Sequence, residues 1–389
     1  MQPLTGDLDF ARRVPTHGQY LWIGVEYQSH DRYDTTVPQL ILVLRDLFPA
    51  RLSREASASL PRLPALEQWL ARGDVESGTG GWRQWLQREY AGGNLAALPS
   101  ASIAGAAVAG LPADQPLWYA TPMHLVAGLD TVRVHPAGLL QLDLEEQQLL
   151  QGDFARVFEG SGWSLHATGR RELLLAGGPV LAAAALRSTD PAQWLGADPR
   201  AGMPGGQGSE PLRRLGSELE MWLHEHPVNR IRLGRRQLNA NALWLWGGGA
   251  TVAAGAGVAP PGAPPGAPRG TPRGAAAWAD ELFIDGLARL AGLQLQPPAG
   301  RWPQAAAGPQ PAGEVIAVCE LGAVPDERSL RSMESDWIAP ALAQWRRGPA
   351  RRITLLAGNR AVTLGRAPLR TLWRRLRRTR PWWETLLAC

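Results

Sequence analysis

The feature that most constrains the fold is an apolar run between two prolines, P38-QLILVLRDLF-P49. A run of Leu, Ile and Val without polar alternation is typical of a strand buried on both faces, as in the parallel sheets of α/β proteins. Helix signals follow over Pro64–Gly73, with proline at the first position and glycine past the end, and over Trp82–Tyr90. This part of the chain therefore predicts an α/β fold.

The C-terminal part continues the alternation of helix and strand. The patterns predict helices at Ala276–Leu290 and Ser329–Arg346, and strands at Glu314–Glu320 and Arg352–Ala357. We therefore expect one α/β core with a mainly parallel sheet, built from both ends of the chain.

The middle of the chain has a different pattern, with short strand candidates and few helices between them. This pattern predicts a smaller α+β domain inserted into the core. Its expected strands are Leu125–Val134, Trp163–His166 and Glu172–Leu175, and its expected helices are Asp143–Phe158 and Leu212–Glu225, the second stopped by Pro227.

These patterns divide the chain into five parts. Residues 247–275 are rich in Gly and Pro and are expected to form a flexible loop, directly after a buried core strand at Ala242–Trp246. The predicted parts are an N-terminal extension (1–36), the first part of the core (37–116), the inserted domain (117–238), the second part of the core (239–365) and a basic C-terminal helix or tail (366–389).

Composition excludes several classes of protein. Every one of the 40 basic residues is arginine, so mechanisms that need a lysine, such as a P-loop or a Schiff base, are excluded. No apolar run reaches the roughly 18 residues of a membrane span, and the N-terminus has no apolar signal region. The two cysteines, Cys319 and Cys389, suggest no disulfide framework. We expect a cytoplasmic protein.

The C-terminal stretch Arg366–Arg380 holds seven arginines and no acid. Leu369, Leu372, Trp373 and Leu376 fall at helical spacing, as in a basic amphipathic helix that contacts nucleic acid or an anionic membrane. The favoured interpretation is a docked terminal helix with a solvated arginine face, because this chain uses arginine for every cation.

The central stretch H224-EHPVNRIRLGRRQLNANALWLWGG-G249 combines histidines, arginines and a triple glycine. His224 and His226 are two residues apart, a spacing that on a helix points them about 200° apart, so they do not share a metal ion. Arginines of the expected loop after the helix suit phosphate or carboxylate, or form a solvated cluster near a helix end. These arginines are Arg230, Arg232, Arg235 and Arg236.

H226-PVNRIR-232, followed by N241-ALWLWGG-G249, resembles the motif HPVNxxR…NxxWLWGxG of archaeal-type cofactor-independent phosphoglycerate mutases, in the alkaline phosphatase superfamily. The stretch is still more similar to that of a bacterial branch, the RpfE-like regulatory proteins. Leu40–Asp46, Pro64–Gly73, Trp118–Asp130 and Ala279–Gly292 resemble other segments of this group.

The resemblance implies an alkaline-phosphatase-like core and an insert on the substrate side. Active enzymes of this kind use two divalent metals, usually manganese, and a serine that is transiently phosphorylated. Ser100 and Ser102 are the candidates for that nucleophile, and Asp46 and Asp326 are the candidate remnants of the metal ligands.

Several expected metal ligands are missing from this sequence. Asp46 is followed by Leu47 instead of glycine, the serines lack a neighbouring aspartate, and no histidine occurs after His226. We therefore expect a protein that has lost most of the two-metal site, with no cofactor, or with Mn²⁺ if it is an active mutase or phosphatase.

Ligand-binding residues are carried over from the same motif. They are His226, Asn229, Arg232 and Asn241, although Arg236 stands where a glycine is expected and Asn239 where a proline is expected. The sequence thus predicts a non-catalytic or weakly active regulatory protein that binds a phosphorylated or carboxylated metabolite, or a protein partner. The alternatives are an active metal-dependent enzyme, and binding of nucleic acid or a membrane surface through the C-terminal arginines.

Overall fold

The computed structural model describes residues 39–47, 60–90, 95, 98–112, 114–178, 188–249, 275–303, 314–321, 325–366 and 379–387. All of them belong to one compact unit, Thr35–Cys389. The predicted N-terminal extension, most of the Gly/Pro-rich loop and residues 367–378 of the basic stretch lie outside the described residues. Within the described part, no helix has the length and apolar character to cross a membrane.

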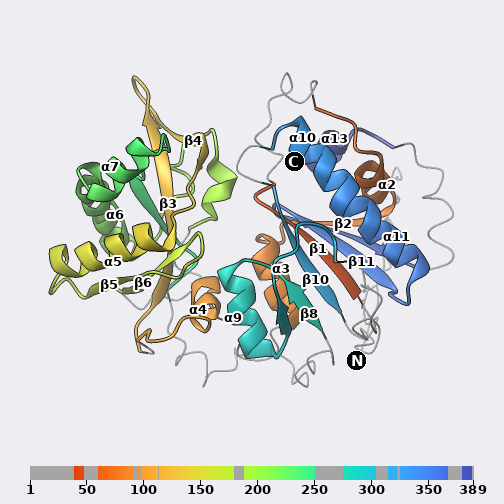
Figure 1. Cartoon of the computed structure of the whole chain (residues 1–389), viewed down its shortest axis with the longest axis horizontal. Coiled ribbons are helices and arrows are strands. Elements are labelled where there is room, and N and C mark those ends of the chain that lie inside the picture. Colours follow the sequence, from red (N-terminus) through yellow and green to blue (C-terminus); the bar gives the residue numbers. More distant parts are fainter. Residues whose placement is uncertain are drawn as a thin grey trace, which may run out of the picture. The chain divides into compact units, whose positions relative to one another are not determined.

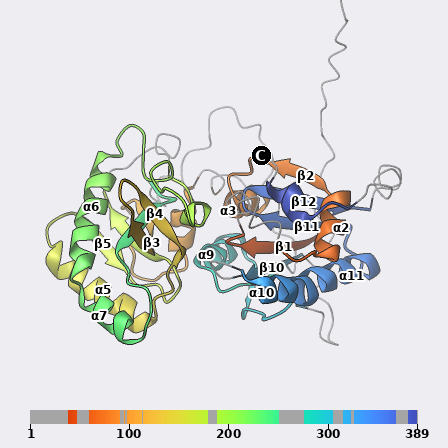
Figure 2. The same ribbon diagram turned by 90° about the horizontal axis from the view of Figure 1, so that it is seen from above.

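A seven-stranded sheet has the strand order β2-β12-β11-β1-β10-β8-β9 (Figures 1 and 2). The central strand β1 (Gln39–Arg45) runs parallel to both of its neighbours, as the buried apolar run predicts. On one side of β1 lie β10 (Val315–Glu320), β8 (Ala276–Trp278) and β9 (Gln294–Gln296), all parallel to their neighbours. On the other side β11 (Arg352–Ala357) is followed by β12 (Arg360–Gly365) and β2 (Asp74–Ser77), which are each antiparallel to the strand before them.

Successive side chains of β1 enter two different cores because a strand alternates its faces. Leu42 and Leu44 pack with helices α2 (Pro64–Arg72), α11 (Ala339–Arg347) and α13 (Trp382–Leu387). Ile41 and Val43 pack with α3 (Trp82–Tyr90) and α9 (Leu282–Ala291). Helices therefore cover both faces of this sheet (Figure 1).

One predicted helix of the core is wrong in its first half. Ala276–Trp278 forms strand β8, and the helix α9 begins only at Leu282, where the Glu281 side chain accepts a hydrogen bond from Ile284 N. Alanine favours helix locally, but pairing with β10 buries Ala276 and Ala277 in the sheet. The predicted Ser329–Arg346 helix is confirmed as α10 (Glu327–Ser332), a π-helical turn (Met333–Ile338) and α11.

A second, antiparallel sheet is formed by the middle of the chain. It has the order β4-β3-β6-β5, with β7 paired to the other edge of β3. Its strands are β3 (Leu117–Ala127), β4 (Val132–Leu139), β5 (Trp163–His166), β6 (Leu173–Gly177) and β7 (Ala242–Trp246), and its helices are α5 (Leu144–Val157), α6 (Glu210–His224) and α7 (Pro227–Gly234).

Two strand predictions for this region are corrected by the pairing. The expected strand Leu125–Val134 is instead a hairpin, because β3 turns back into β4 through residues 128–131. Strand β7, expected in the α/β core, pairs with Tyr119–Met123 in the second sheet. Leu243 and Leu245 fill the core beneath α6, which an apolar pattern alone does not assign to either sheet.

Residues 227–234, expected as a loop, form helix α7. Proline is at its first position, and its end is a Schellman motif in which Arg236 N donates to Leu233 O and Gln237 N to Arg232 O. Arg236 has φ = 56°, the left-handed conformation that normally selects glycine. The left-handed backbone explains why glycine is expected at position 236, and it means that the backbone of Arg236 is strained.

Replacing Arg236 with glycine should relieve that strain. We expect Arg236→Gly to raise the free energy of unfolding by about 1 kcal/mol in urea denaturation, because left-handed backbone penalises a side chain. The control Arg230→Gly, within the right-handed backbone of α7, should lower it by about 1 kcal/mol. An unchanged or lower stability of Arg236→Gly would contradict this account of the helix end.

Candidate functional site: an arginine–carboxylate network

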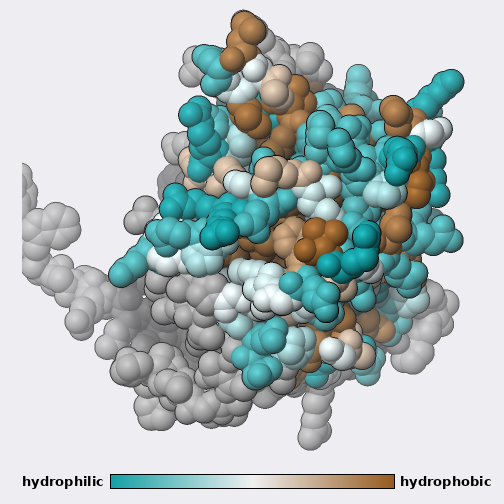
Figure 3. All heavy atoms as spheres, turned by 90° about the vertical axis from the view of Figure 1, so that its left-hand side faces the viewer, coloured by the Kyte–Doolittle hydropathy of each residue, from teal (hydrophilic) through white to brown (hydrophobic). Residues whose placement is uncertain are grey.

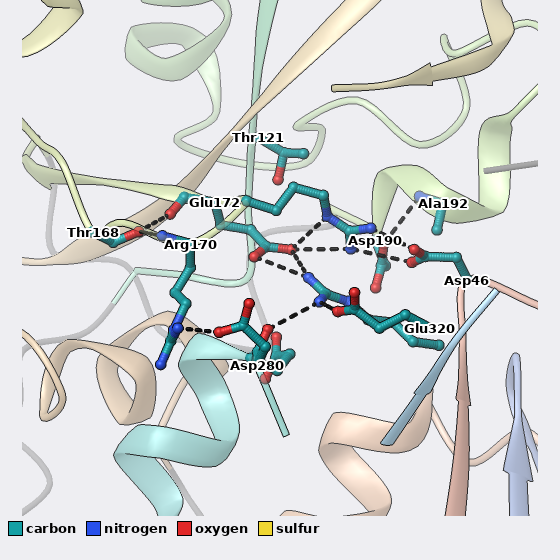
Figure 4. Close-up of polar contacts among 12 residues, drawn as sticks. Asp46, Thr121, Thr168, Arg170, Glu172, Asp190, Ala192, Asp280 and Glu320 are labelled. Atoms are coloured by element: carbon teal, nitrogen blue, oxygen red, sulfur yellow. Dashed lines mark hydrogen bonds and ion pairs between the residues drawn. The ribbon is translucent and has the colours of Figure 1, made fainter. Parts of the chain in front are cut away.

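Charged residues gather where the parallel strands of the first sheet end. Arg45 is the last residue of β1 and its register partner Glu320 the last of β10, while Asp280 and Glu281 closely follow β8. Carboxyl ends of parallel strands form the edge at which α/β proteins commonly bind ligands. Figure 4 shows that residues of the second sheet and its loops reach this edge.

Glu172, directly before β6, is the carboxylate on which the network converges. It is completely buried, and Arg45 Nη2 lies 3.1 Å from its Oε1 and 3.3 Å from its Oε2. Arg171 donates to the same Oε1 from Nε and Nη2 at 3.2 and 3.1 Å, and Arg83 Nη2 lies 3.6 Å away. Three guanidiniums from different parts of the chain thus surround one carboxylate.

The loop before β6 is positioned by the buried side chain of Gln147 on α5. Gln147 Oε1 accepts hydrogen bonds from Thr168 N and Gly169 N, and its Nε2 donates to Arg170 O at 2.6 Å. Thr168 Oγ1 in turn donates to Glu172 O. These bonds fix the backbone that presents Arg170, Arg171 and Glu172 to the first sheet.

Asp46, directly after β1, is held by Arg171. Both terminal nitrogens of that guanidinium donate to the two carboxylate oxygens, Nη2 at 3.1 Å from Oδ1. Asp46 has φ = 65°, a left-handed conformation that aspartate tolerates better than most residues. The turn aims its side chain across to the second sheet (Figure 4).

Arg83 connects helix α3 to acids from two other segments. Its Nη1 lies 2.6 Å from Asp190 Oδ2, and its Nη2 lies 2.7 Å from Glu281 Oε1. The guanidinium also lies over the rings of Trp82 and Trp246, at 4.2 and 4.9 Å from their centroids. This buried arginine is therefore paired with acids and stacked on aromatic rings.

Burial and charge act in opposite directions on these acids. Burial alone would raise the pKa of Glu172 and of Asp46, but the nearby guanidiniums, that of Arg171 first, outweigh it and lower both pKa values. For Asp190 burial prevails over Arg83, and its pKa is raised. Glu172 and Asp46 are thus held as carboxylates.

The donor set at this edge does not fit a pair of divalent metals. Asp46 and Glu172 are neutralised by arginine, and a guanidinium repels a metal ion. Among the described residues, no group of three or more His, Cys, Asp or Glu side chains is arranged to hold a metal. We therefore derive no chemical step through a metal at this edge.

The other candidates for the metal site and the nucleophile lie on separate elements. Asp326 caps helix α10, accepting from Ser329 N at 2.8 Å. Ser100 and Ser102 lie on the short helix α4 (Ser100–Gly105), where Ser100 Oγ donates to Gly247 O at 3.4 Å and Ser102 is buried. Their catalytic and metal-binding roles stay predictions.

His226 is the N-cap of helix α7. Its Nδ1 accepts from Val228 N at 3.1 Å, while Nε2 lies 3.4 Å from Asp153 Oδ2, an oxygen that also accepts from Trp222 Nε1 at 2.8 Å. The ring is buried and meets Trp222 edge to face at 4.9 Å between centroids. Burial lowers the pKa of His226, against a smaller opposing effect of Asp153.

The Asn229 side chain connects Leu223, near the end of α6, with Ala240, just before β7. Its Nδ2 donates to Leu223 O and Ala240 O at 2.8 and 2.9 Å, and its Oδ1 accepts from Ala240 N at 2.8 Å. Asn241 forms a similar pair of bonds with the backbone of Leu125.

Arg232 is also bonded within the chain. It donates to Leu238 O at 2.7 Å and pairs with buried Glu146 at 3.0 Å. Each of the four motif residues thus has a structural partner, and their predicted ligand-binding role stays a prediction.

Two glycines at the end of the motif, Gly247 and Gly248, are favoured by backbone conformation and by close packing. Gly247 has φ = 66°, and a Cβ on Gly248 would lie 1.9 Å from Leu117 O. These glycines therefore serve the folding of the chain around β7.

Sequence reasoning missed most of the network. The signals available were R170-R-E172 before a strand, Arg45 at the end of the central strand and D280-E281 after another. None of them says which arginine meets which acid, because the partners are far apart in sequence, as Arg45 and Glu172 are.

Comparisons with known proteins give a distant likeness. No protein-family model and no curated protein matches the chain. One similar solved structure is the PH0037 protein from Pyrococcus horikoshii, at 13% identity and a TM-score of 0.40, covering 85% of this chain and 87% of that protein. Another is the cofactor-independent phosphoglycerate mutase from Thermoplasma acidophilum DSM 1728, at 14% identity and a TM-score of 0.32, covering 90% of this chain and 98% of that protein. Neither likeness says anything about the activity of this chain.

The network should contribute strongly to stability. We expect Arg171→Met to lower the free energy of unfolding by about 3–5 kcal/mol, because it leaves the Asp46 carboxylate without its paired arginine and removes one of the guanidiniums around buried Glu172. The control Arg331→Met removes an exposed pair with Glu327 and should cost less than about 1 kcal/mol in the same urea denaturation. Equal small losses in both variants would contradict the importance of the network.

His226 should make folding stability sensitive to mild acid. Its folded pKa is lowered, so the unfolded state takes up protons first as the pH falls below about 6.5, and stability falls from there until the folded pKa is passed. Asparagine in His226→Asn still accepts a hydrogen bond at the N-cap but does not titrate in this range. The free energy of unfolding of this variant should therefore fall less between about pH 7 and 5 than that of the unmodified chain. His124→Asn is the control, and an unaltered profile in His226→Asn would refute the assignment.

Proposed function

We propose that this chain is a non-catalytic regulatory protein, similar to the RpfE-like branch of phosphoglycerate mutase-like proteins. The observation that carries the proposal is the pairing of Asp46 and Glu172 with Arg171 and Arg45 at the carboxyl edge of the first sheet. In the enzymes that the sequence resembles, an aspartate at the end of the first strand binds metal. Here that carboxylate neutralises an arginine, and the arrangement stabilises the fold in place of metal-assisted phosphoryl transfer.

The proposed ligand is a metabolite with a phosphate or carboxylate group, or a protein partner. The exposed arginines of the motif, Arg230 and Arg236, suit an anion better than buried Arg232, which already pairs with Glu146. The exposure of these two arginines supports an anion-binding surface on and just after α7.

An enzyme assay tests the loss of catalysis. Purified protein with added Mn²⁺ should convert 3-phosphoglycerate no faster than the Asp46→Ala variant, and should hold no stoichiometric metal by elemental analysis. Turnover at an ordinary enzyme rate, about 1 s⁻¹ or more, that is abolished by Ser100→Ala or Ser102→Ala would instead establish the active mutase or phosphatase.

A binding assay tests the ligand separately. In calorimetry with 3-phosphoglycerate, Arg230→Ala together with Arg236→Ala should weaken binding about tenfold or more, because two cationic donors are removed. Arg214→Ala, an exposed arginine of α6, is the control. Absence of binding by the unmodified protein would exclude 3-phosphoglycerate as the ligand.

A further inference from the structure

The β3–β4 hairpin ends in an exposed apolar tip. Its turn, residues 128–131, is closed by a hydrogen bond from Gly128 N to Thr131 O. Leu129 at the tip is fully exposed, at 108% relative accessibility, and Val126 and Val132 beside it are 41% exposed. Figure 1 shows the hairpin extending past the neighbouring elements, and Figure 3 shows apolar residues on the surface at that upper end. An exposed apolar projection of this kind marks a contact site.

A small apolar recess lies near the base of the same hairpin. Its walls come from β3, β7, α6 and the loop at residues 199–204, and include Leu125, Met203, Leu212 and Trp244. Among the described strands β7 pairs only with β3, so the recess borders its free edge. The volume is about 40 Å³, room for roughly three water-sized groups, so the recess can take the end of one apolar side chain.

Gly216 of α6 leaves this recess open. A Cβ added there would meet nothing within 4 Å, so the packing of the chain itself does not require glycine at this position. Glycine is a poor helix former in the middle of a helix such as α6 (Glu210–His224). Its presence is explained if a group from outside the chain occupies the space above it.

The charges beside the tip and beside the recess are complementary. The tip carries exposed Asp130 and Arg133, and the recess carries Arg213 and Glu220. Asp130 of the tip is opposite in charge to Arg213 of the recess, and Arg133 of the tip is opposite in charge to Glu220. Partial burial beside the recess also raises the pKa of Glu220, because its carboxylate is less well hydrated there. A cation from a partner would offset this loss of hydration.

We propose that two copies of this chain form a two-fold symmetric dimer, in which Leu129 of each hairpin enters the recess beneath Gly216 of the other copy. A two-fold axis makes such an exchange reciprocal, since a surface that carries both the projection and the recess is self-complementary. Asp130 then lies near Arg213 of the second copy, and Arg133 near its Glu220. This inference is independent of the proposed function.

The test is the mass of the full chain in solution between about 1 and 200 μM, measured by sedimentation. The unmodified protein should shift from monomer to dimer over this range. Leu129→Ser and Gly216→Leu should each raise the dimer dissociation constant at least about tenfold, while Val157→Ser, which changes an exposed apolar residue of α5, should leave it unchanged. Gly216→Leu should fold at least as stably as the unmodified chain, because leucine favours helix, so loss of the dimer cannot be attributed to unfolding.

Charge reversal and mixing identify the contact. Asp130→Arg and Arg213→Asp should each weaken the dimer, and the two together should restore it. A mixture of Leu129→Ser with Gly216→Leu chains should associate more tightly than either alone, because one intact tip meets one open recess.

Three results would overturn the proposal. They are a monomer at all concentrations, a dimer that neither Leu129→Ser nor Gly216→Leu weakens, and a monomer in which Leu129→Ser instead abolishes binding to vesicles containing an anionic lipid. The last outcome would make the hairpin a membrane contact.

Discussion

The burial of Glu172 among Arg45, Arg171 and Arg83 is the interaction on which the rest of the structure depends. Arg45 comes from the central strand of the first sheet and Arg83 from a helix packed on it, whereas Arg171 and Glu172 precede a strand of the second sheet. Isolated buried charges are costly, so each guanidinium and carboxylate stabilises the fold only while its partners are in place. The network therefore requires both sheets to adopt their observed contact.

The same pairing bears on metal binding at this edge of the sheet. A two-metal centre needs carboxylates free to bind cations, and here arginines already satisfy Asp46 and Glu172. An arginine keeps its charge at every accessible pH and cannot be released as a metal ion can. In the proposed function the chain keeps the scaffold, and exposed residues such as Arg230 and Arg236 serve for binding.

Local patterns predicted much of the fold, and distant partners explain the rest. The apolar run at β1, the helices α2 and α5, and the strands β5 and β11 could be predicted because they follow from periodic patterns and from residues at their ends, such as Pro64 at the start of α2 and Asp143 capping α5. Ala276–Trp278 and Ala242–Trp246 could not, since only the neighbouring strand decides whether an apolar segment is helix or strand, and in which sheet it lies. For the site, sequence reasoning selected His226, Asn229 and Arg232 from their motif, but their polar contacts depend on residues such as Ala240, Glu146 and Asp153, which only the folded chain brings near.

The central claim is that arginines, and no metal ion, neutralise the carboxylates at the edge of the first sheet. Thermal unfolding in the presence of EDTA and of millimolar Mn²⁺ tests it most directly, because any ion that binds the native state stabilises it by mass action. The account predicts the same melting temperature in both. A melting temperature several degrees higher with Mn²⁺, lost again in Asp46→Ala, would contradict it.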